Sequence, residues 1–102
     1  MIELIPKEIL SKLPHIYESV ATTDPICYVK FFTPDSNFTW YVIELSKDDL
    51  NTCYGYVKGL EDELGYFTLS ELKGTRGALG LGVELDTAYK AMKLSEVKKL
   101  IK

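Results

Sequence analysis

The sequence predicts one α+β domain, a small antiparallel sheet of three to four strands with short helices packed on one face. Residues 26–45 hold two runs rich in β-branched and aromatic residues, ICYVKFF and FTWYVIEL, on either side of a turn-forming stretch, TPDSN. Short amphipathic segments with helix-start signals occur on both sides of this region. A length of 102 residues is typical of one domain, so we expect residues 1–102 to fold as a single unit.

The first helix is expected to begin at Pro6, because proline suits the first turn of a helix. Ile9, Leu10 and Leu13 then form one apolar stripe. Pro14 ends the segment, since it disfavours helical geometry in the residue before it.

A β-hairpin should follow, with strands at 26–32 and 38–45 joined by a turn at 34–37. Side chains alternate between the two sides of a strand, and both sides of these strands carry aromatic residues. An antiparallel sheet usually has one apolar and one polar face. We therefore expect one set of rings in the core and the other on an interaction surface.

A third strand is predicted at 52–57, where Gly55 indicates a bulge or a close approach of two backbones. A short extended piece at 64–67 should lead into a helix. That helix is expected to begin at Thr68, because Thr68 and Glu71 match a capping box.

The C-terminal third begins with a glycine-rich loop at 74–82, and residues 83–86 are expected to return as an edge strand. The loop lacks the residue order of a phosphate-binding motif, so it is first interpreted as a connection. It does contain Arg76, whose guanidinium could pair with a carboxylate or phosphate. Ser95 is expected to cap the last helix.

Charge argues against nucleic acid as a partner. The net charge is −3, and Arg76 is the only arginine among twelve basic residues. Proteins that bind nucleic acid usually have a basic surface and use arginine forks. We expect no direct nucleic-acid binding.

The residue types that carry catalysis or bind metals are scarce. Cys27 and Cys53 lie in apolar runs and are interpreted as small buried hydrophobic residues, and His15 is the only histidine. Zinc usually needs four clustered ligands, and a nucleophile needs a positioned base. We therefore predict no enzyme activity, no metal site and no cofactor. Glu84 and Asp86 share one side of a strand, a pair typical of a charged sheet edge.

The first ten residues, MIELIPKEIL, lack the basic start and long apolar run of a signal peptide. No apolar stretch approaches the length of a membrane span. A cytoplasmic location, without membrane contact, is expected.

The chain resembles the family catalogued as domain of unknown function 2958 in four stretches: LIPKEILSKLP (4–14), KFFTPDSNFTWY (30–41), ELGYFTLSEL (63–72) and RGALGLGVELD (76–86). The resemblance implies a small protein of plasmids, phages and other mobile elements. It supplies no catalytic residues. The residues shared by the motifs are equally consistent with a common fold: Phe32, Thr33, Pro34, Asp35, Trp40, Gly65, Tyr66, Arg76, Gly77 and Glu84.

Together these observations predict a non-enzymatic binding protein of a phage or mobile element that sequesters a host-derived, nucleotide-like ligand or a defence component. Two alternatives stay open: a protein-binding inhibitor or DNA-mimic antirestriction protein, and a structural or regulatory homodimer without a ligand. The predicted ligand-binding residues come from the hairpin and the two segments expected beside it: Phe32, Thr33, Asp35, Asn37, Trp40, Arg76 and Glu84.

Overall fold

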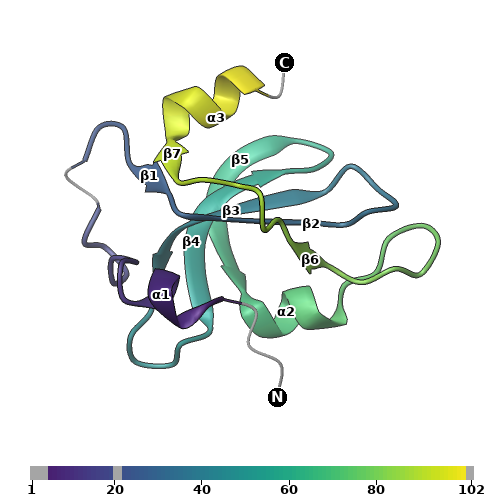
Figure 1. Cartoon of the computed structure of the whole chain (residues 1–102), viewed down its shortest axis with the longest axis horizontal. Coiled ribbons are helices and arrows are strands. Elements are labelled where there is room, and N and C mark those ends of the chain that lie inside the picture. The colour runs from purple at the N-terminus through teal and green to yellow at the C-terminus, as the bar shows by residue number, and fades with distance from the viewer. Residues whose placement is uncertain (1–4, 20–21, 101–102) are drawn as a thin grey trace.

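The computed structural model describes residues 5–19 and 22–100 and shows an antiparallel sheet with the strand order β5-β4-β3-β2-β6. A second, two-stranded sheet pairs β1 with β7 (Figure 1). The strands are β1 (Ile26–Cys27), β2 (Val29–Phe32), β3 (Thr39–Leu45), β4 (Thr52–Lys58), β5 (Asp62–Thr68), β6 (Glu84–Leu85) and β7 (Met92–Lys93). The helices are α1 (Lys7–Leu10), α2 (Leu69–Gly74) and α3 (Leu94–Leu100).

The predicted α+β class, the antiparallel sheet and the hairpin are confirmed. Strands β2 and β3 pair antiparallel, with Phe31 opposite Trp40, and the Thr33 N–H donates to the Phe38 carbonyl at 3.2 Å. The main sheet has five strands, one more than the upper end of the prediction. The segment predicted as one strand, 26–32, is divided: residues 26–27 leave the sheet to pair with β7.

Helices cover both faces of the sheet, which corrects the prediction of helices on one face. On one face, Leu69 and Leu72 of α2 join a core with Phe31, Trp40 and Val42. The segment around α1 packs on the same side (Figure 1).

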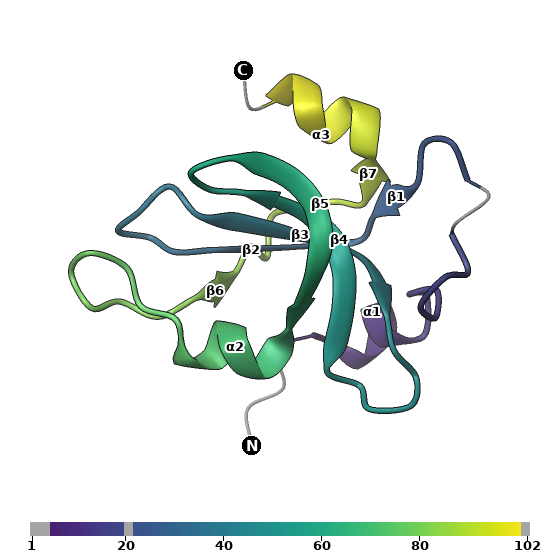
Figure 2. The ribbon, with the colours of Figure 1, turned by 180° about the vertical axis from the view of Figure 1, so that it is seen from behind.

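The second face carries α3. Leu94 and Val97 of this helix pack against Tyr41, Ile43 and Tyr56. The rings of Tyr41 and Tyr56 on this face therefore belong to the core. Tyr66, which α3 does not cover, remains accessible to solvent. Seen from behind, β4 and β5 curve strongly past the helix (Figure 2).

A β-bulge in β3 decides which way Glu44 points. The register with β4 shifts between Val42 and Glu44, so that Glu44 lies opposite Tyr54. Simple alternation would place Glu44 on the face of Val42, but a bulge adds one residue and re-aims the side chains that follow. Glu44 and Tyr54 therefore share the second face.

Gly55 fits the predicted close approach of backbones. A Cβ atom on Gly55 would lie 1.8 Å from the Tyr41 carbonyl oxygen, so any side chain here would push β3 and β4 apart. Across the strand pair, Gly65 lies opposite Gly55, and a Cβ atom on Gly65 would meet nothing within 4 Å. A side chain is therefore excluded at Gly55 but has room at Gly65.

The predicted helix start is confirmed for α2 and corrected for α3. Thr68 and Glu71 form the predicted capping box of α2. At α3, Ser95 lies inside the first turn instead of at the cap. Its N–H and Oγ donate to the carboxylate of Asp24 at 2.9 and 2.6 Å, which lowers the pKa of Asp24. These bonds tie the loop before β1 to α3.

Both cysteines are free and buried, as predicted. Burial raises the pKa of the Cys27 and Cys53 thiols to about 12. None of the helices in the described part of the chain has the length and apolar character needed to cross a lipid bilayer.

Candidate functional site

The hairpin tip holds the glycine-rich loop through Asp35. Oδ2 of Asp35 accepts the N–H of Leu79 at 2.6 Å and that of Leu81 at 3.2 Å, while Oδ1 is buried without a hydrogen-bond partner in the described ranges. A Cβ on Gly77 would lie 1.5 Å from Oδ1, so a larger residue there would displace the Asp35 carboxylate. Asp35 acts structurally, as a clamp between two loops that lie side by side (Figures 1 and 2).

Replacing Asp35 with alanine is expected to release this loop and destabilise the protein by about 1–2 kcal/mol, because two backbone donors lose a charged acceptor. Amide hydrogen exchange should become faster at Leu79 and Leu81. Asn37→Ala, at an exposed position of the same turn, is the matched control and should leave both amides protected. Unchanged protection in Asp35→Ala would contradict the clamp.

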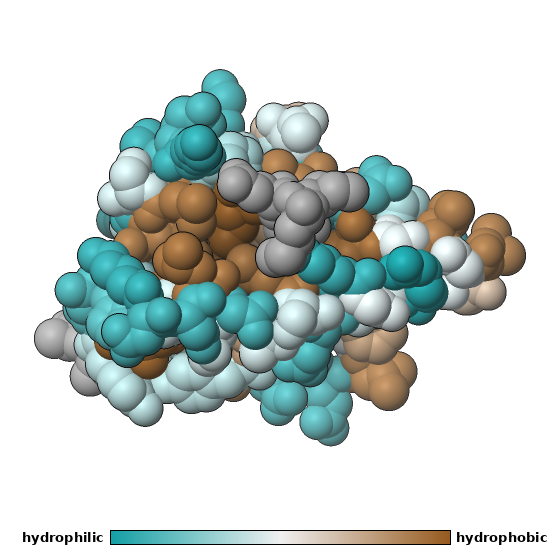
Figure 3. Space-filling view, turned by 90° about the horizontal axis from the view of Figure 1, so that it is seen from below, coloured by the Kyte–Doolittle hydropathy of each residue, from teal (hydrophilic) through white to brown (hydrophobic). Residues whose placement is uncertain are grey.

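The loop that Asp35 holds carries two exposed leucines, Leu79 and Leu81. Leu79 is 82% exposed and Leu81 is also exposed. Viewed from the side of α1 and α2, hydrophobic side chains gather at the end of the molecule that this loop forms (Figure 3).

Arg76 and Trp40 do not form a common site with the hairpin tip. Nη1 of Arg76 donates to the carbonyls of Lys73 and Thr75 at 2.8 and 2.9 Å and so closes the end of α2. Trp40 is only 8% exposed and belongs to the core beneath α2, stacked on Phe38 with ring centroids 6.0 Å apart. Because its ring is buried, Trp40 offers no accessible face for a ligand to stack on.

Three of the predicted residues lie together. Phe32, Thr33 and Asn37 line a broad hollow of about 540 Å³ on the second face. Glu84 is exposed on β6, opposite Phe32. The lysines of the hollow, Lys30 and Lys58, form ion pairs with Asp86 and Asp62 at 3.3 and 3.4 Å, which reduces the charge available to an anion.

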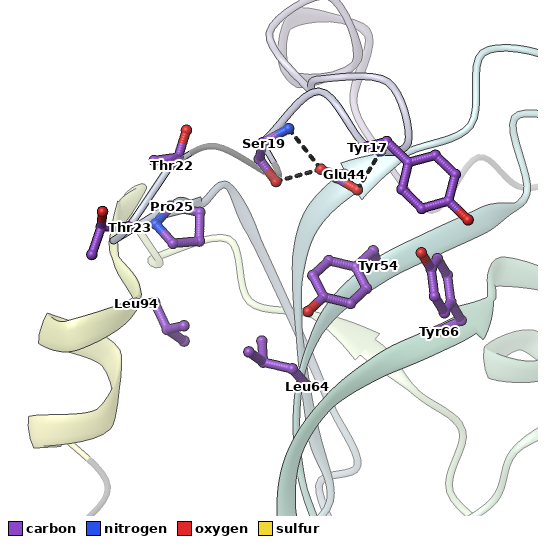
Figure 4. A pocket seen from close by; sticks show the side chains of 10 residues that line it. All are labelled: Tyr17, Ser19, Thr22, Thr23, Pro25, Glu44, Tyr54, Leu64, Tyr66 and Leu94. Atoms are coloured by element: carbon purple, nitrogen blue, oxygen red, sulfur yellow. Dashed lines mark hydrogen bonds between the residues drawn. The ribbon is translucent and has the colours of Figure 1, made fainter.

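A different pocket, of about 310 Å³, lies on the second face, at the edge of the area that α3 covers (Figure 4). We call it the tyrosine pocket. Strands β3, β4 and β5 supply one wall, and the loop before β1 and helix α3 supply the other. Its lining residues are Tyr17, Ser19, Thr22, Thr23, Pro25, Glu44, Tyr54, Leu64, Tyr66 and Leu94.

Glu44 provides the only charged group among these lining residues. It is 2% exposed, and its carboxylate accepts the N–H groups of Tyr17 and Ser19 at 3.0 and 2.8 Å. The Ser19 hydroxyl donates a further, short hydrogen bond. The bulge in β3 and the turn at 15–19 thus meet at one carboxylate (Figure 4).

Tyr17 is held in a conformation unusual for a side chain of its size. Its φ is +72°, in the left-handed region that non-glycine residues rarely adopt. The hydrogen bond from its N–H to Glu44 fixes this turn. Such backbone strain is often found at functional sites.

Tyr54 and Tyr66 form the aromatic side of the pocket. Their ring centroids lie 5.1 Å apart, with the planes tilted by 55°. Tyr66 is 55% exposed, whereas Tyr54 is half-buried and packs against the core beneath α3. Hydrogen bonding to Tyr17 raises the pKa of Tyr66 to about 12, and the negative charge of Glu44 acts in the same direction.

Tyr17→Phe is therefore expected to return the pKa of Tyr66 towards the ordinary tyrosine value of about 10. A group whose pKa is raised by folding stabilises the protein below its unfolded pKa and loses this effect as pH rises. In the parent protein, the contribution of Tyr66 should thus disappear between about pH 10 and 12. An NMR titration of the Tyr66 ring measures this pKa, and urea unfolding between about pH 9 and 12 measures the loss of stability. An unchanged pKa in Tyr17→Phe would contradict the hydrogen bond.

Sequence reasoning did not find the tyrosine pocket, although one signal was present. Glu44 interrupts the apolar run of FTWYVIEL, and a charged residue inside a strand buried on both sides needs a partner or a function. In the sequence, Tyr66 stands out only as part of the stretch ELGYFTLSEL. The turn at 15–19, which supplies the hydrogen-bond donors, carries no recognisable motif.

A family model described as "Protein of unknown function (DUF2958)" matches residues 4–100. The chain belongs to this family. The match spans α1 to α3, so the tyrosine pocket and the Asp35 clamp both lie within the DUF2958 region. Comparisons of this DUF2958 chain with curated proteins and with solved structures found no match.

Proposed function

We propose that this DUF2958 protein is a non-catalytic binding protein of a phage or other mobile element, which sequesters a small host molecule in the cytoplasm. The observation that carries the proposal is the tyrosine pocket, where a buried carboxylate lies beside two tyrosine rings. Apolar lining with a few fixed polar groups is typical of small-molecule sites. A volume of about 310 Å³ lies at the lower end of the usual range for such sites.

The tyrosine pocket supports binding better than the predicted hairpin site. Of the residues predicted for stacking and phosphate binding, Trp40 is buried and Arg76 closes α2. The tyrosine pocket instead holds its polar group in place through a network of three hydrogen bonds. Groups fixed before binding lose less entropy when a ligand arrives.

The proposal is tested by incubating the purified protein with a deproteinised extract of bacterial cells, removing unbound molecules by desalting, and identifying retained compounds by mass spectrometry. Leu64→Arg places a long side chain at the rim of the tyrosine pocket and should abolish retention. Leu79→Arg, in the exposed loop after α2, is the matched control and should retain the same compound. Equal retention by both variants, or none by the parent protein, would contradict the proposal.

A second candidate is a protein-binding or homodimer surface at the edge strand β5. Within the described ranges β5 pairs only with β4, and Leu60, in the preceding turn, is almost fully exposed. The acidic residues 61–63 beside it are typical of edges protected from pairing, which weakens this candidate. Light scattering of the parent protein and of Leu60→Arg decides it: a dimer that Leu60→Arg dissociates would support the second candidate.

A further inference from the structure

We propose that the occupant of the tyrosine pocket is a small organic cation, bound with its positively charged nitrogen towards Glu44 and the rings of Tyr54 and Tyr66. This inference rests on the proposed function, because it names the class of ligand that the same pocket would take. It departs from the nucleotide-like ligand expected from the sequence.

Glu44 is a buried negative charge that pairs with no cation among the described residues. Glu44 is almost completely buried, and the ion pairs found in residues 5–19 and 22–100, Lys30 with Asp86 and Lys58 with Asp62, do not involve it. Hydrogen bonds from Tyr17 and Ser19 satisfy part of the carboxylate, but these donors are neutral. A buried charge is normally paired. A ligand cation would supply the missing partner.

The rings of Tyr54 and Tyr66 in the pocket lining also favour a cation. The face of a tyrosine ring carries negative electrostatic potential and attracts cations, most strongly where water is excluded. Tyr54 and Tyr66 lie at 5.1 Å and 55° to each other, so they present two differently oriented rings to one space (Figure 4). Glu44 and Tyr54 are cross-strand partners, so rings and carboxylate lie on the same face.

The lining of the tyrosine pocket disfavours anionic ligands. Its polar lining, apart from Glu44, consists of hydroxyl groups from Ser19, Thr22, Thr23 and the tyrosines, and no lysine, arginine or histidine occurs among the lining residues that the structure describes. Phosphate and carboxylate ligands normally require such donors. Next to Glu44 they would also meet a like charge. The same pocket therefore selects against anionic nucleotides.

The size of the pocket favours a free small molecule over a partner protein as the source of the cation. A volume of about 310 Å³ suffices for a compact amine or quaternary ammonium compound. A lysine side chain of another protein offers the same charge, and the experiment distinguishes the two.

The test compares choline with its neutral isostere, 3,3-dimethylbutan-1-ol, by NMR titration of the parent protein. Both probes have the same shape, so only the charge differs. Choline should bind about tenfold more tightly or better, with shifts at Tyr54, Tyr66 and Ser19. Equal affinity of the two probes would overturn the inference, as would tighter binding of inorganic phosphate. Binding of a lysine peptide without binding of choline would overturn the small-molecule source.

Glu44→Gln removes the charge with little change of shape and should lower choline affinity about tenfold or more. If this variant does not fold, as judged by its circular dichroism, the isostere comparison in the parent protein still decides. Tyr54→Leu removes one ring of the tyrosine pocket and should weaken choline binding, whereas Leu79→Arg, outside the pocket, should bind choline as the parent does. If the extract experiment instead identifies a neutral or anionic compound in the pocket, the inference fails while the proposed function stands.

Discussion

Glu44→Ala should destabilise the protein by about 3 kcal/mol, one of the two largest effects expected in this chain. The variant leaves the N–H groups of Tyr17 and Ser19 without their acceptor and opens a hole in a buried strand. An unsatisfied buried donor costs about 1–3 kcal/mol. These two N–H groups are part-buried, so water and relaxation of the turn at 15–19 recover part of this cost. Urea unfolding measures the loss.

Glu84→Ala is the matched control, since Glu84 is an exposed glutamate of the same sheet. Its stability should stay within about 0.5 kcal/mol of the parent. A loss below about 1 kcal/mol in Glu44→Ala would mean that the carboxylate does not hold the turn at 15–19. The wall of the tyrosine pocket would then need another explanation.

Gly55→Ala should cost about 2–3 kcal/mol, because the new methyl group would overlap the backbone of β3. The Cβ would lie 1.8 Å from the Tyr41 oxygen and 3.2 Å from the Val42 Cα. Backbone atoms cannot rotate away as a side chain can, so β3 and β4 must separate. Because the bulge that aims Glu44 adjoins Val42, the variant should also weaken ligand binding.

Gly65→Ala provides the control within the same strand pair. Gly65 lies opposite Gly55, and a Cβ there meets no atom within 4 Å. Alanine at this position should change the free energy of unfolding by less than about 0.5 kcal/mol, or raise it slightly by restricting the unfolded chain. Similar losses in both variants would show that the close contact with the Tyr41 carbonyl is not what makes Gly55 costly to replace.

Local patterns predicted the elements that local interactions form. The turn at 34–37, the capping box at Thr68 and the close approach at Gly55 each depend on residues near in sequence or on a single missing side chain. These features need little knowledge of the rest of the fold.

Contacts between segments distant in sequence could not be predicted from the sequence. Asp35 was predicted as a ligand-binding residue, but its carboxylate accepts hydrogen bonds from the loop at 77–81. Asp24, in a loop, caps α3 in place of Ser95. In each case a short polar side chain accepts hydrogen bonds from backbone N–H groups more than forty residues away in sequence. The spacing of apolar and polar residues within one segment cannot predict such a pairing.

The tyrosine pocket depends on the same kind of long-range arrangement. The bulge at Val42–Glu44 shifts Glu44 to the second face, and strict alternation would have placed it among core residues. The position of α3 then decides which rings are covered. Tyr41 and Tyr56 are buried beneath it, whereas Tyr66 stays accessible.

A host molecule is proposed to bind in the tyrosine pocket and not at the hairpin tip. The most direct test is an amide NMR titration of the parent protein with the deproteinised bacterial extract. We predict that the largest shifts occur at Ser19, Tyr54 and Tyr66. Shifts concentrated at Phe32, Thr33 and Asn37, which line the hollow at the hairpin tip, would contradict this proposal if the residues of the tyrosine pocket did not shift.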